Sequence, residues 1–389
     1  MKKKILMVFG TRPEAIKMAP VVKACRVRPE LDVKVCVTAQ HRQMLDQVMD
    51  IFGLTADFDL NVMAPNQTLA DVTSKVLKGM EGVFAQWMPD MILVQGDTTT
   101  VMAAALAAFY HKIAVGHVEA GLRTWNVYSP WPEEMNRMIA GCLATLHFAP
   151  TPRSAQNLLK ENKDSTKVFV TGNTVIDALH EAMKIMDGDG ALRTRLAAQF
   201  PFLDASKRLI LVTGHRRENF GDGFTHICNA VRRVASRSDV QVVYPMHMKA
   251  NVRKSVTEIL GGLGNVHLIE PLDYLSFLYM MRQSYLIMTD SGGVQEEAPS
   301  LGKPVIVMRD TTERPEAVDA GTVILAGTET EAMASAAERL LDDKGFYDKM
   351  AQAVNPYGDG LAARRIAEIV ATGSTSLQAG GNGFLLPEV

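Results

Sequence analysis

Short apolar runs alternate with longer stretches of helical periodicity along the whole chain. In the first half the apolar runs are Ile5–Phe9, Val33–Thr38, Met91–Gln95, Ile113–Val118 and Leu146–Ala149. In the second half they are Leu209–Thr213, Val240–Tyr244, Val266–Ile269, Tyr285–Thr289 and Val305–Met308. Nearly continuous apolar runs are typical of parallel strands buried on both faces. Alternation with helices, such as those expected over 68–87 and 101–111, predicts an α/β fold of doubly wound sheets.

The rhythm of strands and helices restarts after residue 207, which predicts two domains. A chain of 389 residues is also longer than one hydrophobic core usually serves. Residues 175–207 are helical, polar and interrupted by glycines, so they read as the join between two sheets. We expect a Rossmann-like domain over 1–171 and a second over 172–359. A helix over 360–371 is expected to pack back on the first domain, and 374–389 to be poorly ordered.

Charge and apolar content exclude several classes of protein. Lys and Arg number 41 and Asp and Glu 43, and this net charge of −2 argues against a nucleic-acid partner. The apolar start at Ile5–Phe9 is too short for a secretion signal or a membrane span, and no later run is long enough. The four cysteines form no CxxC pair, so buried free thiols and a reducing, cytoplasmic location are expected.

Several cofactor motifs are missing from the expected places. The first strand ends in Gly10-Thr11-Arg12-Pro13 without the further glycines of a nicotinamide-binding GxGxxG. No P-loop, HExxH, GxSxG or clustered Cys/His set is found. The sequence therefore signals neither a nicotinamide nor a metal cofactor.

Charged residues follow the first predicted strand. Arg12 and Lys17 lie on either side of Pro13, a residue preset for the first turn of a helix. Two cations at a helix N-terminus suit an anionic ligand. A plain strand–helix turn with surface charges explains the same residues equally well.

Three carboxylates come from successive strand ends or loops of the first domain. Asp97 follows one strand, Glu119 closes the next, and Glu133 opens a later helix. Arg123 is an alternative, purely structural partner for Glu119, and dipole stabilisation alone explains Glu133. If the three converge, mutual repulsion should raise at least one pKa, which acid/base chemistry requires.

The second half carries a turn suited to phosphate. Thr289-Asp290 feeds a turn of Ser291, Gly292 and Gly293 that opens a helix, so backbone N–H groups can approach phosphate oxygens. An ordinary helix cap is the alternative. Glu297 lies one turn on, placed to accept from ribose hydroxyls, and Arg314 adds a cation. His215, beside two arginines at a strand end, reads as a phosphate contact.

Over residues 5–371 the chain resembles the non-hydrolysing UDP-N-acetylglucosamine 2-epimerases. The resemblance rests on GTRPEAIKMAP, GDTTT, HVEAGLRT, PWPEEMNR, GNTVIDAL, HRREN, DSGGVQEEAPSLGKPV and RDTTERPEAV, in this order. It implies a glycosyltransferase-B-like fold, with two Rossmann-like domains facing a cleft. It also implies a homodimer and reversible conversion of UDP-GlcNAc to UDP-ManNAc for bacterial surface polysaccharide, without a cofactor.

The resemblance assigns roles residue by residue. It implies catalytic roles for Asp97, Glu119, Glu133 and His215, and a uracil pocket lined by Phe277. The implied substrate contacts are Arg12, Lys17, Ser291, Gly292, Gly293, Glu297 and Arg314. A second, activating UDP-GlcNAc site would involve Gln40, Gln43, Arg217 and His247, although residues alone favour an ordinary loop histidine at the last position.

The chemistry expected of such an enzyme is elimination of UDP to a 2-acetamidoglucal, followed by re-addition with the C2 proton on the other face. Two faces call for at least two acid/base groups. Three other functions remain open: a hydrolysing epimerase that releases ManNAc and UDP, a glycosyltransferase of the same fold, and a sugar-nucleotide sensor without turnover.

Overall fold

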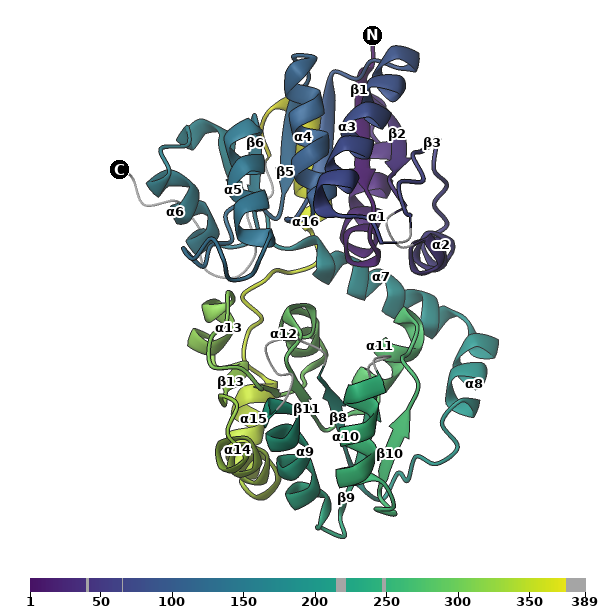
Figure 1. Ribbon diagram of the computed structural model, residues 1–389, viewed down its shortest axis with the longest axis vertical. Helices are drawn as coiled ribbons and strands as arrows, with labels where there is room; N and C mark the ends of the chain where they lie inside the picture. Colours follow the sequence, from purple (N-terminus) through teal and green to yellow (C-terminus); the bar gives the residue numbers. More distant parts are fainter. Residues whose placement is uncertain (40–41, 65, 215–221, 247–249, 376–389) are drawn as a thin grey trace. The chain divides into compact units, whose positions relative to one another are not determined.

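The computed structural model describes residues 1–39, 42–64, 66–214, 222–246 and 250–375, and the chain divides into two compact units, each with one parallel sheet (Figure 1). Unit 1 contains residues 1–182 and 357–389, and unit 2 contains residues 183–356. Along the chain, the first boundary between the units falls within helix α7 (Thr174–Gly188), in the polar segment 175–207.

The sheet of unit 1 has seven strands in the order β3-β2-β1-β4-β5-β6-β7. The strands are β1 (Lys3–Phe9), β2 (Leu31–Val37), β3 (Phe58–Asp59), β4 (Met91–Gln95), β5 (Ala114–Val118), β6 (Leu146–Ala149) and β7 (Val168–Val170). All neighbouring strands run parallel. The order reverses between β1 and β4, and in such sheets ligands bind at the carboxyl ends of the two strands beside the reversal.

Helices cover the unit 1 sheet. They are α1 (Arg12–Arg26), α2 (Arg42–Ile51), α3 (Leu69–Gln86), α4 (Thr99–Tyr110), α5 (Glu133–Leu143), α6 (Pro152–Lys160), the 3₁₀ helix η1 (Ser165–Lys167), the first part of α7, and α16 (Ala362–Thr372). Helix α4 lies between α3 and α5 (Figure 1), and its alanines at 103–105 and 107–108 are buried, so small side chains allow close packing. Helix α16 packs against α1 within the same unit.

Unit 2 repeats the architecture with six parallel strands in the order β10-β9-β8-β11-β12-β13. The strands are β8 (Arg208–Thr213), β9 (Val240–Pro245), β10 (Val266–Ile269), β11 (Leu286–Thr289), β12 (Val305–Val307) and β13 (Val323–Leu325). The helices are α8 (Gly190–Ala198), α9 (Asp222–Ala235), α10 (Ala250–Leu260), α11 (Tyr274–Gln283), α12 (Gly292–Glu297), the 3₁₀ helix η3 (Ala298–Leu301), α13 (Pro315–Asp319), α14 (Thr330–Asp342) and α15 (Lys344–Ala351). Here the order reverses between β8 and β11.

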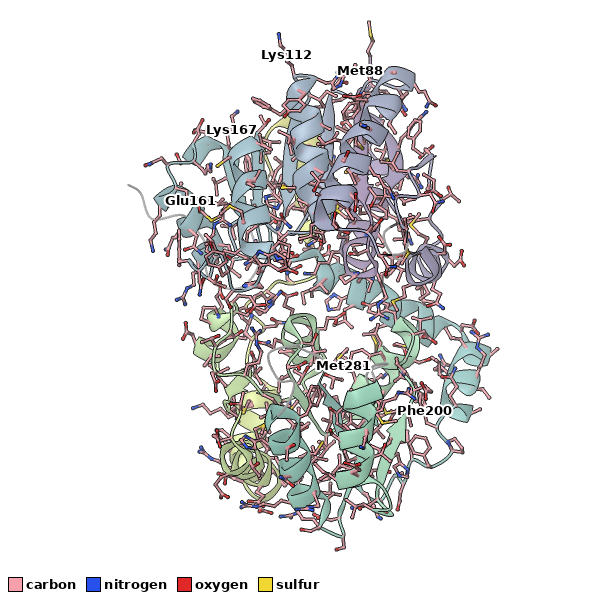
Figure 2. All side chains as sticks on the ribbon, viewed as in Figure 1. Met88, Lys112, Glu161, Lys167, Phe200 and Met281 are labelled. Atoms are coloured by element: carbon pink, nitrogen blue, oxygen red, sulfur yellow. The ribbon has the colours of Figure 1, made fainter. Side chains whose placement is uncertain are left out.

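Each unit has its own core between the sheet and its helices. Met281 is fully buried in unit 2, whereas Met88 and Lys112 project from unit 1 (Figure 2). The predicted α/β class, with two doubly wound Rossmann-like sheets, is confirmed. Cys25, Cys36 and Cys228 are buried free thiols, as expected, whereas the free thiol of Cys142 is exposed. Within the part of the chain that the structure describes, every helix is too short or too polar to cross a lipid bilayer.

Candidate active site

Polar side chains from three connections gather at the carboxyl edge of the unit 1 sheet. Arg12 and Lys17 lie near the start of α1, Asp97 follows β4, and Glu119 follows β5. Because this edge includes the reversal between β1 and β4, it is where a doubly wound sheet binds its ligand. The structure therefore places these four predicted residues at the functional edge of one sheet.

Glu119 is a buried carboxylate with two side-chain donors. Its Oε2 accepts a hydrogen bond from Lys17 Nζ at 2.6 Å and another from Gln95 Nε2. Its backbone is left-handed, with a φ of 63°, a conformation that costs about 1 kcal/mol for a residue with a side chain. The ion pair with Lys17 compensates the buried charge, so the predicted cation at α1 acts on this carboxylate directly.

Arg123 is not the partner of Glu119. Its Nε donates to Glu161 Oε1 at 2.6 Å and its Nη2 to Glu161 Oε2 at 2.9 Å. The chain turns between the two residues through Gly121, whose φ is 90°, and this turn directs Arg123 toward α6 instead. The structural explanation that the sequence offered for Glu119 is therefore wrong.

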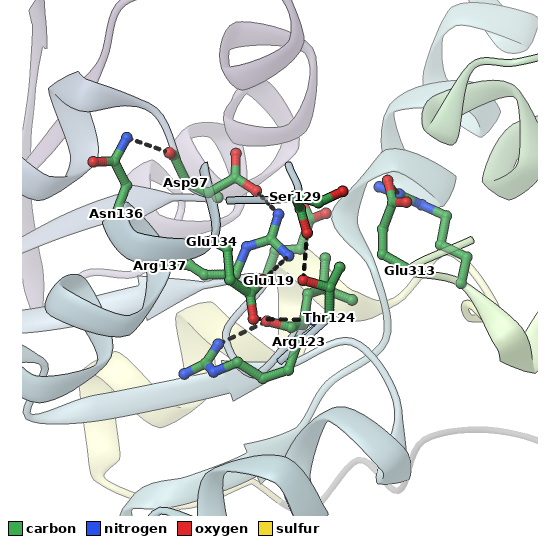
Figure 3. Close-up of polar contacts among 12 residues, drawn as sticks. Asp97, Glu119, Arg123, Thr124, Ser129, Glu134, Asn136, Arg137 and Glu313 are labelled. Atoms are coloured by element: carbon green, nitrogen blue, oxygen red, sulfur yellow. Dashed lines mark hydrogen bonds and ion pairs between the residues drawn. The ribbon is translucent and has the colours of Figure 1, made fainter. Parts of the chain in front are cut away.

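Asp97 is held by residues of α5 (Figure 3). Arg137 Nη2 donates to Asp97 Oδ2, and Asn136 Nδ2 donates to the backbone carbonyl of Asp97 at 3.0 Å. The second arm of the same guanidinium, Nη1, donates to Glu134 Oε2 at 3.0 Å. One arginine thus bridges two carboxylates and fixes the orientation of Asp97.

Glu134 connects this ion pair to the loop after β5. It is fully buried, and its Oε1 accepts backbone N–H groups from Thr124 at 3.0 Å and Trp125 at 2.9 Å (Figure 3). Glu134, Arg137 and Gln95 were not among the residues predicted from the sequence. The spacing of three between Glu134 and Arg137 was the available signal, because it places both side chains on one helix face.

Glu133 and Arg12 differ from the other predicted residues of unit 1. Glu133 is the first residue of α5 and is partly buried, as is Arg12 at the first position of α1. Neither side chain forms a hydrogen bond or ion pair with another residue that the structure describes. The structure therefore brings Lys17 into contact with Glu119 and fixes the orientation of Asp97. It shows no such contact for the side chains of Glu133 and Arg12 among the described residues.

Two buried histidines lie behind the strand ends. His117 on β5 is paired in register with His147 on β6. Burial lowers the pKa of His117 to about 4 and that of His147 to about 3, so both rings are neutral near pH 7. Neutral His117 donates from Nε2 to the carbonyl oxygen of Gly96 at 2.7 Å, which supports the turn that presents Asp97.

The Ser-Gly-Gly turn of unit 2 lies where the sequence placed it, after β11 and beside the reversal of strand order. Thr289 at the end of β11 contacts Thr213 at the end of β8, with 2.6 Å between the two hydroxyl oxygens. The Thr289 hydroxyl also accepts the N–H of Ser291 at 2.9 Å. Ser291 occupies the N-cap of α12, as the alternative explanation expects, but its side chain makes no cap hydrogen bond.

Arg314 covers the start of α12. A Cβ added to Gly292 would lie 2.5 Å from Arg314 Nη1, so only glycine leaves room for the guanidinium there. Arg314 Nε donates to Glu296 Oε1 at 2.6 Å, and Nη1 donates to Glu313. The predicted cation is therefore present at the glycine turn, and two buried carboxylates orient it.

The remaining predicted site residues of unit 2 lie on α11 and α12, the two helices that follow β10 and β11. Glu297 is buried and its Oε1 accepts a hydrogen bond from the Tyr274 hydroxyl at 3.0 Å, a contact that the sequence did not predict. Phe277 is partly buried in α11, one turn after Tyr274.

Several predicted residues fall outside the described part of the chain. They are the catalytic candidate His215 and the allosteric candidates Gln40, Arg217 and His247, together with the side chain of Gln43. Among the residues that are described, no three His, Cys, Asp or Glu side chains gather in an arrangement that would hold a metal ion.

Comparison with known proteins places this geometry in context. Residues 23–371 match the family model described as UDP-N-acetylglucosamine 2-epimerase. The chain is 56% identical over 375 residues to the UDP-N-acetylglucosamine 2-epimerase of Escherichia coli K12, covering 96% of this chain and 100% of the relative. It is 55% identical over 370 residues to that of Bacillus subtilis, covering 94% of each.

Solved structures give the same result. The UDP-GlcNAc 2-epimerase of Neisseria meningitidis, crystallised with UDP-GlcNAc, superposes with a TM-score of 0.90 at 51% identity, covering 94% of this chain and 99% of the other. The Methanocaldococcus jannaschii UDP-GlcNAc 2-epimerase, in complex with UDP-GlcNAc and UDP, gives 0.81 at 34% identity, with coverage of 94% and 99%. The likeness therefore extends over nearly the whole of each chain.

Proposed function

Because this chain belongs to the UDP-N-acetylglucosamine 2-epimerase family, we propose that it reversibly converts UDP-GlcNAc to UDP-ManNAc without hydrolysing either sugar nucleotide. The reaction inverts C2 of the sugar. That carbon carries no acidic proton, because no carbonyl is adjacent to it. An elimination that makes C1 cation-like as the C1–O bond breaks would acidify the C2 proton and so make inversion possible.

The reaction would proceed in two balanced steps. In the first, a base takes the C2 proton while the C1–O bond breaks and its electron pair leaves with UDP, which gives a 2-acetamidoglucal with a double bond between C1 and C2. In the second, a UDP oxygen adds back to C1 and a proton is delivered to the opposite face of C2. Because removal and delivery occur on opposite faces, two acid/base groups are required.

The observation that carries the proposal is the pair of carboxylates fixed beside cations at neighbouring strand ends of unit 1. Glu119 accepts from Lys17, and Asp97 accepts from Arg137. We propose these two residues and Glu133 as the acid/base groups, with Arg12 and Lys17 as substrate contacts. Glu133 has no partner among the described residues, so its side chain can turn toward a substrate.

Unit 2 would hold the nucleotide. The N–H groups of Gly292 and Gly293 and the hydroxyl of Ser291 suit a diphosphate, and Arg314 over the same turn adds a fixed cation. Such groups stabilise the charge that develops on the departing diphosphate, and each is worth on the order of 100-fold in rate. Glu297 is proposed for the ribose, Phe277 for uracil and His215 for the phosphate side.

The experiment that tests the reaction uses deuterated water. The protein is incubated with UDP-GlcNAc, and C2 of each sugar nucleotide is followed by NMR. UDP-ManNAc that carries solvent deuterium at C2 is expected. Epimerised product that retains the original hydrogen would rule out elimination, and stoichiometric release of free UDP and ManNAc would identify a hydrolysing enzyme instead.

Two further proposals concern assembly and control. The chain would act as a cytoplasmic homodimer, and light scattering of the purified protein would give its mass in solution. A second UDP-GlcNAc would activate it through Gln40, Gln43, Arg217 and His247. A sigmoidal dependence of initial rate on UDP-GlcNAc is expected, and a hyperbolic dependence would contradict activation.

A further inference from the structure

Glu14 is a buried carboxylate that the proposed reaction does not use. It lies in the first turn of α1 with 2% of its surface exposed, and burial raises the pKa of its carboxyl group. Enclosing a carboxylate is costly unless donors surround it. The donors around Glu14 therefore indicate what the residue holds in place.

The donors to the Glu14 carboxylate come from two different connections. Its Oε2 accepts the backbone N–H groups of Gly10 at 3.0 Å and Thr11 at 2.7 Å, both in the connection after β1. Its Oε1 accepts the hydroxyl of Thr98 at 2.7 Å, in the connection after β4. The carboxylate therefore joins the two strand ends between which the strand order of the sheet reverses.

Each of the joined connections carries one of the ion pairs described above. Lys17 lies three residues after Glu14, on the same face of α1, and reaches Glu119. Asp97 immediately precedes Thr98 and accepts from Arg137. A displacement of α1 relative to α4 would therefore move Lys17 and Asp97 apart, and the contacts of Glu14 resist such a displacement.

The packing around this contact leaves little freedom. A Cβ added to Gly10 would overlap the hydroxyl of Thr38, which lies 3.0 Å from the hydroxyl of Thr100. Close packing of this kind transmits a small change at one connection to the other.

Helix capping alone does not account for Glu14. Helix α3 has the same capping box, in which Thr68 and Asp71 each accept a backbone N–H of the other, and there the carboxylate is exposed. An aspartate therefore suffices for the cap, and neither burial nor a bond to a second connection is needed. The additional methylene of Glu14 is what allows it to reach Thr98.

We propose that Glu14, through Thr98, is a positioning residue that holds Lys17 and Asp97 in register at the edge of the unit 1 sheet. This inference rests on the proposed epimerase reaction. Since a misplacement of about 1 Å can cost on the order of 100-fold in rate, loss of the contact should appear in kcat more than in substrate binding.

The test shortens the side chain of Glu14 in one variant and removes the hydroxyl of Thr98 in another. Glu14→Asp keeps the α3-type cap but draws the carboxylate back from Thr98, and Thr98→Val removes the hydroxyl. Each is expected to lower kcat by about 10- to 100-fold with KM for UDP-GlcNAc within about threefold. Thr98→Ser should retain kcat. The double variant, which combines Glu14→Asp and Thr98→Val, should have a kcat no lower than that of either single variant, because both changes remove the same hydrogen bond.

Thr98 also caps α4, so the matched control is Thr68→Val, which removes the equivalent cap from α3. It should lower Tm as Thr98→Val does and leave kcat unchanged. A folded Thr98→Val with wild-type kcat would overturn the proposal, as would equal losses in Thr98→Ser and Thr98→Val or additive losses in the double variant. If Glu14→Asp fails to fold, the two Thr98 variants decide. An inactive wild-type protein would instead refute the proposed reaction.

Discussion

Lys17 Nζ lies 2.6 Å from Glu119 Oε2, although 102 residues separate the two in sequence. They follow β1 and β5, which are not neighbours, because β4 lies between these strands. Gln95, the last residue of β4, donates to the same oxygen. The contact therefore extends across the edge of three strands and gives one carboxylate a charged and a neutral donor.

Lys17→Met tests what the lysine contributes. Because the substitution leaves Glu119 buried without its cation, we expect kcat to fall by about 100-fold. A rise in KM alone would mean that Lys17 acts only as a substrate contact and would contradict a role at Glu119. Lys75→Met is the control, since Lys75 is exposed on α3 and its Nζ donates to a backbone carbonyl, that of Val62.

Arg137→Met should destabilise unit 1. The change leaves Asp97 and the fully buried Glu134 without the guanidinium that both accept from. Removing one partner of a buried ion pair costs about 3–5 kcal/mol. Urea denaturation measures the loss. Arg233→Met breaks an exposed cluster with Glu331 and Glu338, and because solvent screens these charges it should cost much less than the change at Arg137. Equal losses in the two variants would show that burial does not set the strength of the Arg137 pairs.

Gly292→Ala should weaken UDP binding. The new Cβ would meet Arg314 Nη1 at 2.5 Å, and the guanidinium cannot withdraw without breaking its bonds to Glu296 and Glu313. Calorimetry should show a Kd raised by about 10-fold, since one lost charged hydrogen bond is worth roughly 1.5–3 kcal/mol.

The control for Gly292→Ala is Gly82→Ala. Gly82 lies inside α3, where an added Cβ has nothing within 4 Å. The protein should gain roughly 0.5–1 kcal/mol in stability from this change and bind UDP unchanged. Wild-type UDP affinity in Gly292→Ala would refute the close contact between Arg314 and the turn.

Asp177 should make stability depend on pH. Its carboxylate accepts the N–H groups of Ala362 and Ala363 at the start of α16, and burial raises its pKa from 3.8 to about 6. Because the folded state holds the proton more tightly than the unfolded state, this group's stabilising contribution is complete below pH 4. It is lost as pH rises through about 6.

Asp177→Asn removes that titration. The stability of the wild type relative to the variant should therefore decrease by up to roughly 3 kcal/mol between pH 4 and pH 6 and stay level above, as measured by urea denaturation. A difference that grew with pH over this range would show that the pKa of Asp177 is lowered in the folded state.

The apolar runs of the sequence were sufficient to predict the central strands, but they predicted the strands at the sheet edges less well. The bounds predicted for Met91–Gln95 and Leu146–Ala149 agree with the structure, and so do those for Val266–Ile269, which forms the edge strand β10 from a clear apolar run. Strands β3, β7 and β13 were missed. All three are short edge strands with a single neighbour, so tertiary pairing rather than a local apolar run defines them.

In the candidate site, too, some features could be predicted from the sequence and others could not. Strand ends identified Asp97 and Glu119 as residues at the functional edge, because that inference needs only topology. Their partners depend on how the connections turn. The sequence offered Arg123 as a structural partner for Glu119, but the left-handed turn at Glu119 and Gly121 directs Arg123 to Glu161. Backbone reversals of this kind are not encoded in spacing.

The position of α16 also determines the order in which the chain can fold during synthesis. Unit 2 is one continuous segment, so it can complete its core as soon as residue 356 has left the ribosome. Unit 1 is interrupted, and α16 reaches it only after all of unit 2 has been made; in the folded unit the buried Arg365 donates to the carbonyl of Thr171. The unit made first is therefore finished last, and the face of α1 that α16 covers stays exposed while the nascent chain grows.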